Sequence, residues 1–503
     1  METKLIWALL PAVLLKLCCF AQSTPAERID SFLRVMSEHQ LFNGSILVAK
    51  EGKVIYQRSY GYWDRARKIP NSDTTAVNLA SVSKPFTSLA VLQLVAKGKI
   101  RLDDPYSRYF PDFPFPAVTI RQLLSHTSGL PKVEDFERPY IDQHPDEVLT
   151  DKEVYAHLLA LKQPLLFQSG AKWDYSNIGY TCLALLVERV SKMPFSDYMR
   201  KYIFMPAGMG HTYVRAAGTP NTPRYIIPAM YMTEYKNVDS LDHRKFYTFF
   251  NLGGIAGCGN VVSTLDDLFR FDQALSAGKL VPAWLMDTAF TPINLNDGKV
   301  FHLRGKGAYG LGWNVVDDPV NDTIVYHDGH ITGIKTLLYR DLSKHLTIIY
   351  YDNMESPIPL DIVGTIARIL GGRELRKLSL AKSLARVYGA ALVSGGVDAA
   401  MTIFDQLKDD SVHYYVDERE LNTLGYELLG SSDIVGHNEL SLEVFKINTL
   451  LYHNANSYDS YAEALMRSGK NEEAIGMYQK SLSLEPHNPA GAKRLAELLK
   501  KKD

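Results

Sequence analysis

The sequence predicts an α+β fold in which both ends of one large unit contribute to an antiparallel sheet, a helical subdomain covers that sheet, and an all-α repeat region follows. Strand-type patterns occur near residues 42–60 and return near 309–351. Amphipathic, helix-type segments dominate between them, from about 119 to 290. Past Gly371-Gly372 the pattern is helical throughout.

Length and composition are those of a globular, multi-unit protein. The 503 residues predict two to four folded units, at about 100–200 residues each. We divide them into a signal peptide over 1–23, an α+β unit over 24–372 and a helical repeat unit over 373–503. Charged residues make up 22% and hydrophobic residues 46%, which argues against wholesale disorder. Because 55 Lys and Arg oppose 56 Asp and Glu, no basic excess favours nucleic acid as a partner.

The N-terminal segment has the layout of a signal peptide. Lys4 precedes an apolar run over 5–15, and the small residues Ala21 and Ser23 lie near the expected cleavage point. An uncleaved anchor is the alternative, but the apolar run is shorter than the roughly 20 residues that span a bilayer. We therefore expect a secreted or periplasmic protein with no stable membrane span after cleavage.

The cysteine and histidine patterns predict neither a metal nor another cofactor. Loss of the signal leaves Cys182 and Cys258, which allow one disulfide, although free thiols are favoured because the two lie in segments with separate local roles. The sequence has no CxxC spacing and no HExxH spacing. His327 and His330 are three apart on a predicted strand and would point to opposite faces.

The predicted sheet begins and ends with short β-rich runs. Runs over 42–50 and 54–60 flank a turn and predict an antiparallel hairpin. The later strands are predicted over 309–314, 324–326, 334–339 and 346–351. One antiparallel sheet that joins the two ends of the unit would accommodate both groups.

A buried helix is predicted directly after Ser81. The segment 86–96 is apolar nearly all round and is closed by Gly98, which is typical of a central helix. Pro85 fits only a first helical turn, so the helix begins close to Ser81.

The tetrad Ser81-Val-Ser-Lys84 carries the candidate chemistry. An offset of three places both side chains on one helical face. The helix N-terminus favours negative charge on Ser81 Oγ. Burial together with the same field would depress the pKa of Lys84, so that a neutral amine could take the hydroxyl proton. A second tetrad, Ser379 to Lys382, lies in a polar segment rich in Lys and Arg, and we interpret it as a surface feature.

The C-terminal region contains three units with a glycine, then a small residue five positions on, then an aromatic residue nine positions on. These are Gly395, Ala400 and Phe404; Gly436, Ser441 and Phe445; and Gly469, Ala474 and Tyr478. The last unit, over 458–486, closely resembles a tetratricopeptide repeat. A generic helical bundle is the alternative interpretation.

Four further strings follow the Ser81 tetrad in a characteristic order. They are Leu123–Pro131 (LLSHTSGLP), Tyr175-Ser-Asn177, Gly257–Leu268 (GCGNVVSTLDDL) and His327-Asp-Gly329 with Gly333 four residues on. Together with the tetrad, over about residues 27–370, they resemble the serine penicillin-recognising hydrolases, particularly the class C β-lactamase-like branch. The resemblance implies a β-lactamase/transpeptidase-like fold and acyl-transfer chemistry.

The resemblance also implies a role for each matching residue. Ser81 would be the nucleophile and Lys84 its base or base partner. Tyr175 would share the proton transfer as a phenolate favoured by Lys84, and which of the two is the base stays open. The substrate-binding set would be Asn177, His327, Gly329 and His330. The backbone N–H groups of Ser81 and His330 would form the oxyanion hole. Two further features are interpreted as structural. His126 is expected to form a hydrogen bond within its own loop. Thr264, with Asp267 three residues on, is expected to cap a helix.

The sequence departs from the family at His327, where β-lactamases and carboxypeptidases hold Lys. A histidine is near-neutral at pH 7 and attracts a substrate carboxylate much less than a fixed cation. An esterase or D-peptidase/carboxypeptidase-like activity on a small-molecule or peptide substrate is therefore favoured over true β-lactamase activity. The alternative is a catalytically silent scaffold whose repeat domain binds a protein or peptide partner. The retention of Ser81, Lys84, Tyr175 and Asn177 favours the enzyme.

Overall fold

The computed structural model describes most of the chain. The described residues are 23–64, 67–132, 140–141, 143–144, 147–215, 253–302, 307–318, 322–331, 333–354, 356, 358–375, 378, 380–431 and 434–500. Residues 1–22 of the predicted signal peptide lie outside these ranges, as does Ser379 of the second tetrad.

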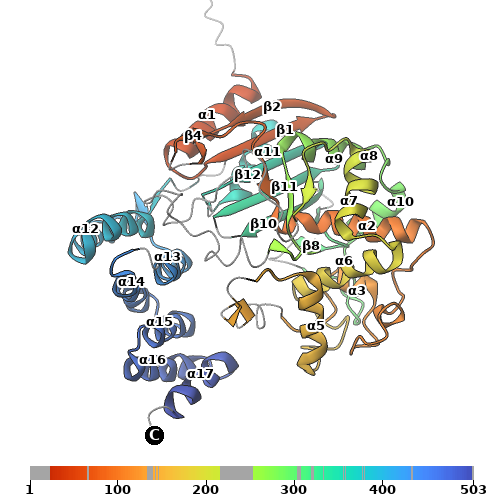
Figure 1. Cartoon of the computed structure of the whole chain (residues 1–503). Coiled ribbons are helices and arrows are strands. Elements are labelled where there is room, and N and C mark those ends of the chain that lie inside the picture. Colours follow the sequence, from red (N-terminus) through yellow and green to blue (C-terminus); the bar gives the residue numbers. More distant parts are fainter. Residues whose placement is uncertain are drawn as a thin grey trace, which may run out of the picture.

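A seven-stranded antiparallel sheet lies at the centre of the larger part of the molecule (Figure 1). Across the sheet the strands are β2 (Lys53–Ser59), β1 (Gly44–Lys50), β12 (Leu346–Asp352), β11 (Ile334–Asp341), β10 (Asp322–Ile331), β9 (Asn314–Asp318) and β8 (Gly307–Tyr309). β1 pairs with β12 so that Gly44 faces Asp352. The two ends of the predicted α+β unit thus meet in one sheet, which confirms the predicted fold class.

The strand predicted over 309–314 is wrong, because this segment is a turn between two strands. β8 ends at Tyr309 and β9 begins at Asn314. Gly312 lies between them with φ +86, and a Cβ there would be 2.7 Å from the Cβ of Ser88. The turn therefore requires glycine for both its backbone conformation and its packing.

Helices cover both faces of the sheet. On one face α1 (Pro25–Glu38) and α11 (Pro359–Leu370) pack against inward-facing residues of β1 and β12. The other face packs against the helical subdomain, whose α-helices include α2 (Lys84–Ala96), α3 (Ile120–Leu124), α5 (Asp151–Leu161), α6 (Asn177–Ser191), α7 (Phe195–Met199), α9 (Leu265–Ser276) and α10 (Ala283–Phe290). α2 lies in the middle of this layer with nearly every residue buried, as the sequence predicts for a central helix.

Shorter elements connect these layers. They are the 3-10 turns η1 (Ala80–Ser83) and η2 (Tyr106–Arg108), the π-helical η3 (Arg200–Phe204), α8 (Met205–Ala207), the hairpin β3 (Tyr62–Asp64) with β4 (Ile69–Pro70), and the small sheet of β5 (Val77–Asn78), β7 (Val261–Ser263) and β6 (Tyr213–Val214). The small sheet leads the chain into η1 and α2, because β5 ends two residues before η1 begins.

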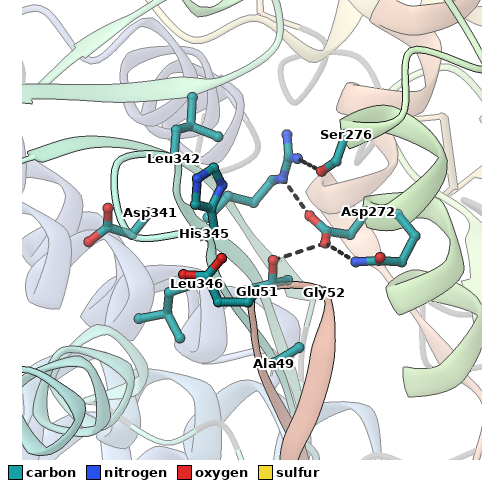
Figure 2. A pocket seen from close by; sticks show the side chains of 12 residues that line it. Ala49, Glu51, Gly52, Asp272, Ser276, Asp341, Leu342, His345 and Leu346 are labelled. Carbon is teal, nitrogen blue, oxygen red and sulfur yellow. Dashed lines mark hydrogen bonds and ion pairs between the residues drawn. The ribbon is translucent and has the colours of Figure 1, made fainter.

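A buried ion pair joins α9 to the central sheet (Figure 2). Arg340 of β11 donates from Nε to Asp272 of α9 at 2.5 Å and from Nη2 to Ser276 at 2.7 Å. Thr347 of β12 donates to the second Asp272 oxygen at 2.9 Å. Because both charges are buried, removing either partner alone would leave an unpaired charge, which typically costs about 3–5 kcal/mol.

The C-terminal region is helical, as predicted, and follows the sheet as a series of helices (Figure 1). These are α12 (Leu384–Leu407), α13 (Glu418–Gly430), α14 (His437–Leu451), α15 (Ala455–Arg467), α16 (Asn471–Leu484) and α17 (Pro489–Lys500). A two-residue parallel bridge, β13 (Lys382–Ser383) with β14 (Tyr414–Tyr415), precedes and follows α12. Arg386 of α12 donates to the carbonyl of Met354, so the first of these helices contacts the chain just after β12.

Among the described helices α12 alone is long and apolar enough, by length and composition, to cross a membrane. It breaks at Gly396, where φ is +78 and ψ is −174. Tyr388, Leu392 and Phe404 on its two sides belong to a core that α12 shares with α13 and α14. Part of its apolar surface therefore packs within the helical region, and 33% of its most apolar window is buried.

Candidate active site

The backbone just before Ser81 is strained and firmly held. Ala80 has φ +47, a left-handed conformation that costs a non-glycine residue about 1–3 kcal/mol. The Ala80 N–H donates to the side chain of Asn78 at 2.9 Å, and Asn78 in turn donates to Asn260 at 2.8 Å. These bonds from β5 and from the loop before β7 fix the turn η1, which carries Ser81 directly into α2.

Lys84 is fully buried at the first position of α2 and lies against Ser81. Its Nζ is 3.0 Å from Ser81 Oγ and 2.9 Å from the carbonyl oxygen of Cys258. The 3-10 turn thus brings residues 81 and 84 together as their spacing predicts. The Cys258 carbonyl is thus a second acceptor for the amine.

The loop that supplies the Cys258 carbonyl is tied to α2 and to α5. Thr87 donates to the carbonyl of Gly257 at 2.7 Å, and the Val261 N–H donates to Ser83 Oγ at 3.0 Å. Asp151, the first residue of α5, accepts from the Ala256 N–H at 3.0 Å and from the next N–H in the chain. Burial raises the pKa of Asp151 to about 7, although these two bonds oppose the shift. Sequence reasoning did not single out Asp151.

Tyr175 lies directly before α6 with its ring beside Lys84, 4.7 Å from Nζ to the ring centroid. Burial raises the pKa of the Tyr175 phenol well above 10, whereas a hydrogen bond with Ser81 lowers it. Burial therefore opposes the phenolate that the sequence-based interpretation invokes. A neutral Tyr175 can instead donate to Ser81 or to a leaving group while Lys84 takes the proton.

Asn177 is the first residue of α6, and it is half-buried. The preceding Ser176 caps the helix by accepting from the Gly179 N–H at 3.2 Å. Tyr175 and Asn177 therefore flank the N-cap of α6, which fixes their positions relative to α2.

His126 braces the Tyr175 segment rather than its own loop. Its Nδ1 accepts from the Ser176 N–H at 3.0 Å, its carbonyl accepts from the Asp174 N–H at 2.9 Å, and its ring lies 4.2 Å from that of Tyr175. Burial holds the pKa of His126 well below 6.5, so the ring is neutral. The hydrogen bond predicted within the loop of His126 thus connects two distant segments instead.

The helix cap predicted at Thr264 is confirmed, since Thr264 accepts from the Asp267 N–H at 3.3 Å.

Strand β10 passes directly beside η1 because Gly329 has no side chain. A Cβ at Gly329 would lie 2.3 Å from the Leu79 carbonyl oxygen and 3.2 Å from the Ala80 Cβ. Thr336 on the neighbouring strand donates to that same carbonyl at 2.7 Å. The close approach positions the residues that follow Gly329, including His330, next to the turn that carries Ser81.

His327 is buried, only 1% exposed. Its Nδ1 lies 2.7 Å from the Asp328 carbonyl and its Nε2 lies 3.1 Å from the hydroxyl of Tyr309. An Nδ1–H tautomer that accepts from Tyr309 satisfies both contacts. Burial lowers the pKa of His327 to about 4, so the ring is neutral near pH 7. His330 is exposed, so the two histidines face different surroundings as predicted.

The described residues contain no group of three His, Cys, Asp or Glu side chains that could hold a metal ion. Cys182 and Cys258 are free thiols. What these residues assemble is a hydroxyl beside a buried amine and a phenol, at the start of a helix and next to a strand edge. Such a site suits acyl transfer through a serine nucleophile.

The comparisons with known proteins agree with this class. The family model described as Beta-lactamase matches residues 29–372. Penicillin-binding protein 4* of Bacillus subtilis (strain 168) is 33% identical over 334 residues, covering 65% of this chain and 72% of that protein. The crystal structure of a penicillin-binding protein from Bacillus halodurans is 25% identical with a TM-score of 0.57, covering 67% of this chain and 98% of that one.

A third relative is similar in fold. The structure of D-amino acid amidase from Ochrobactrum anthropi SV3, complexed with D-phenylalanine, has a TM-score of 0.57 at 22% identity and covers 69% of this chain and 99% of that one. Fold and sequence together define a penicillin-binding-protein-like serine hydrolase. The chain belongs to the β-lactamase family.

Proposed function

We propose that the chain is an exported hydrolase that transfers an acyl group from an ester or amide to Ser81 and then to water. The observation that carries this proposal is the contact between Ser81 and Lys84. A fully buried amine lies 3.0 Å from the hydroxyl and also donates to a backbone carbonyl at 2.9 Å. This is hydrogen-bond reach for a general base.

In the proposed mechanism Ser81 Oγ attacks the substrate carbonyl carbon while its proton passes to Lys84. The N–H groups of Ser81 and His330 would bind the oxyanion, and each such donor typically contributes about 10²–10³ in rate. Collapse breaks the bond to the leaving alcohol or amine, which receives the proton. Water then loses a proton to the same base, attacks the acyl-enzyme, and releases the acid with Ser81 restored.

The substrate class follows from the charge of the site. Because burial keeps His327 neutral near pH 7, it provides no fixed cation for a substrate carboxylate. This favours esters, amides or D-amino-acid peptides over β-lactams. The name of the D-amino acid amidase, whose fold is similar, agrees with an amide of this kind.

We also propose that 24–372 is the catalytic unit and that 373–503 is a tetratricopeptide-like unit that binds a protein or peptide. Supporting this, the small and the aromatic residue of each predicted repeat are buried: Ala400 and Phe404, Ser441 and Phe445, Ala474 and Tyr478. Gly436 directly before α14 and Gly469 shortly before α16 have the positive φ that favours glycine.

Export is tested by the intact mass of secreted material, which should lack residues 1 to about 23. A chain beginning at Met1 would contradict export.

The catalytic proposal is tested with Ser81→Ala on p-nitrophenyl acetate, a small ester. Turnover above the spontaneous rate should be lost in this variant, because it removes the only atom we assign as nucleophile. Ser394→Ala, a matched change on the exposed side of α12, should keep wild-type activity. Equal activity of Ser81→Ala and wild type would refute the proposal.

A further inference from the structure

The backbone segment 256–258 is bonded through its N–H groups to the start of α5. Asp151, the buried first residue of that helix, accepts from the Ala256 N–H at 3.0 Å and from the next N–H at 3.5 Å. Just before these contacts, Thr150 and Gly254 form an isolated parallel β-bridge. The start of α5 therefore fixes this segment through two adjoining sets of backbone contacts.

The carbonyl groups of the same segment bond to α2. The Gly257 carbonyl accepts from the Thr87 hydroxyl at 2.7 Å, and the Cys258 carbonyl accepts from Lys84 Nζ at 2.9 Å. Lys84 Nζ is in turn 3.0 Å from Ser81 Oγ. One short stretch of backbone and one side chain thus connect the carboxylate at the start of α5 with the nucleophile.

The segment is tightly packed on its other contacts. A Cβ at Gly257 would lie 2.1 Å from the Tyr180 carbonyl oxygen and 2.8 Å from the Ala184 Cβ, so the backbone lies directly against α6. Asn260 donates to the Ile255 carbonyl at 2.9 Å, which closes the loop on itself. The segment therefore has no room to move toward α6, and its N–H bonds to α5 oppose movement in other directions.

We propose that Asp151 is a positioning residue for the reaction: it holds the segment 256–258 so that the Cys258 carbonyl keeps the Lys84 amine in place beside Ser81. The inference rests on the proposed function and adds a residue that acts through Lys84. Without the carboxylate two backbone N–H groups lose their acceptor, and the segment shifts to satisfy them elsewhere. The Cys258 carbonyl shifts with it, and a displacement of about 1 Å at a reacting group can cost roughly 10²-fold in rate.

The test measures how fast a fluorophosphonate labels Ser81, together with kcat and KM for p-nitrophenyl acetate, on the full mature chain at pH 8. Burial raises the pKa of Asp151 to about 7, so at pH 8 the group is largely ionised and both oxygens are acceptors. Asp151→Ala removes both acceptors. The labelling rate constant and kcat should each fall by about 10- to 100-fold, with KM unchanged within about twofold, because the reacting groups and not the ester-binding groups are displaced.

Asp151→Asn keeps one acceptor oxygen and turns an NH2 group toward the second N–H. Its labelling rate should therefore fall by about threefold, between the wild type and Asp151→Ala. Asp104→Ala is the matched control, because Asp104 is also buried and accepts from a backbone N–H, that of Arg101, at 2.9 Å. It should lower the melting temperature and leave the labelling rate within about twofold of wild type. Thermal melts establish that each variant is folded at the assay temperature.

A wild-type labelling rate in folded Asp151→Ala or in Asp151→Asn would overturn the inference and leave the proposed function standing. An equal loss of rate in Asp104→Ala, or a raised KM with kcat unchanged in the Asp151 variants, would overturn it as well. Absence of fluorophosphonate label on wild-type Ser81 would refute the proposed function, and the role of Asp151 with it. A loss of rate confined to the Asp151 variants, and larger for Ala than for Asn, would support the assignment.

Discussion

The two sides of the candidate active site differ in construction. On the helix side Lys84 is fully buried, and Ser81 is held through contacts from Asn78 and Cys258. On the strand side Asp328 and His330 are exposed at an edge where pairing with β9 has ended. The difference teaches that the reacting groups are held inside the fold, whereas these two side chains of the strand are open to solvent. Changes on the helix side should therefore alter rate or stability for all substrates.

The largest effect is expected on the helix side, from Lys84→Ala. Removing the proposed proton acceptor should lower the hydrolysis rate by roughly 10²–10⁴, the usual scale for loss of a general base. Ester turnover, measured beside a thermal melt, checks this. Lys97→Ala, at the exposed end of the same helix, should leave the rate unchanged. A folded Lys84→Ala enzyme with wild-type turnover would break the helix-side assignment.

A smaller effect on the same side is expected from His126→Ala. The change leaves the buried Ser176 N–H without its acceptor, and the free energy of unfolding should fall by about 1–3 kcal/mol. Urea denaturation measures it. The exposed His487→Ala should stay within about 0.5 kcal/mol of wild type. If the two variants were equally stable, His126 would not brace the Tyr175 segment.

The pH dependence of stability tests the buried carboxyl that holds the Cys258 loop. Between its ordinary pKa of 3.8 and about 7, folded Asp151 keeps a proton that the unfolded chain has released. Raising the pH over this range therefore destabilises the folded state, by at most about 1.4 kcal/mol per pH unit from this group. The free energy of unfolding of the wild type should fall relative to that of Asp151→Asn from pH 5 to pH 7. Parallel curves would contradict the raised pKa.

The smallest effect is expected from the second tetrad. Ser379→Ala should change neither turnover nor labelling, because the sequence places Ser379 in a polar segment and Lys382, the amine of its tetrad, is exposed. A rate equal to wild type within experimental error is the expected result. A loss of fluorophosphonate labelling in Ser379→Ala would show that the second tetrad also reacts, so that the setting of Ser81 does not distinguish the two tetrads.

The sequence predicts well what depends on neighbours along the chain. The hairpin of β1 and β2 follows from local strand patterns, and the contact between Ser81 and Lys84 follows from an offset of three. Gly312 shows the limit of such patterns, since a turn interrupts what reads as one strand.

What the sequence does not predict are contacts between distant segments. His126 meets Ser176, Asp151 meets the backbone of 256–257, and Tyr309 meets His327. Each contact crosses from one element to another, so no local spacing indicates it. His327 shows the same limit. Its position in the motif can be recognised in the sequence, but its burial against Tyr309 depends on how the strands of the sheet pair.

The central claim is that Ser81 is the acyl-accepting nucleophile, and peptide mapping by mass spectrometry tests it most directly. The mature chain is treated briefly with a fluorophosphonate, digested, and the modified residue is located. The account predicts one adduct, on Ser81 in the peptide that also contains Lys84, and none in Ser81→Ala. An adduct on Ser379 or on any other residue, with Ser81 unmodified, would contradict it.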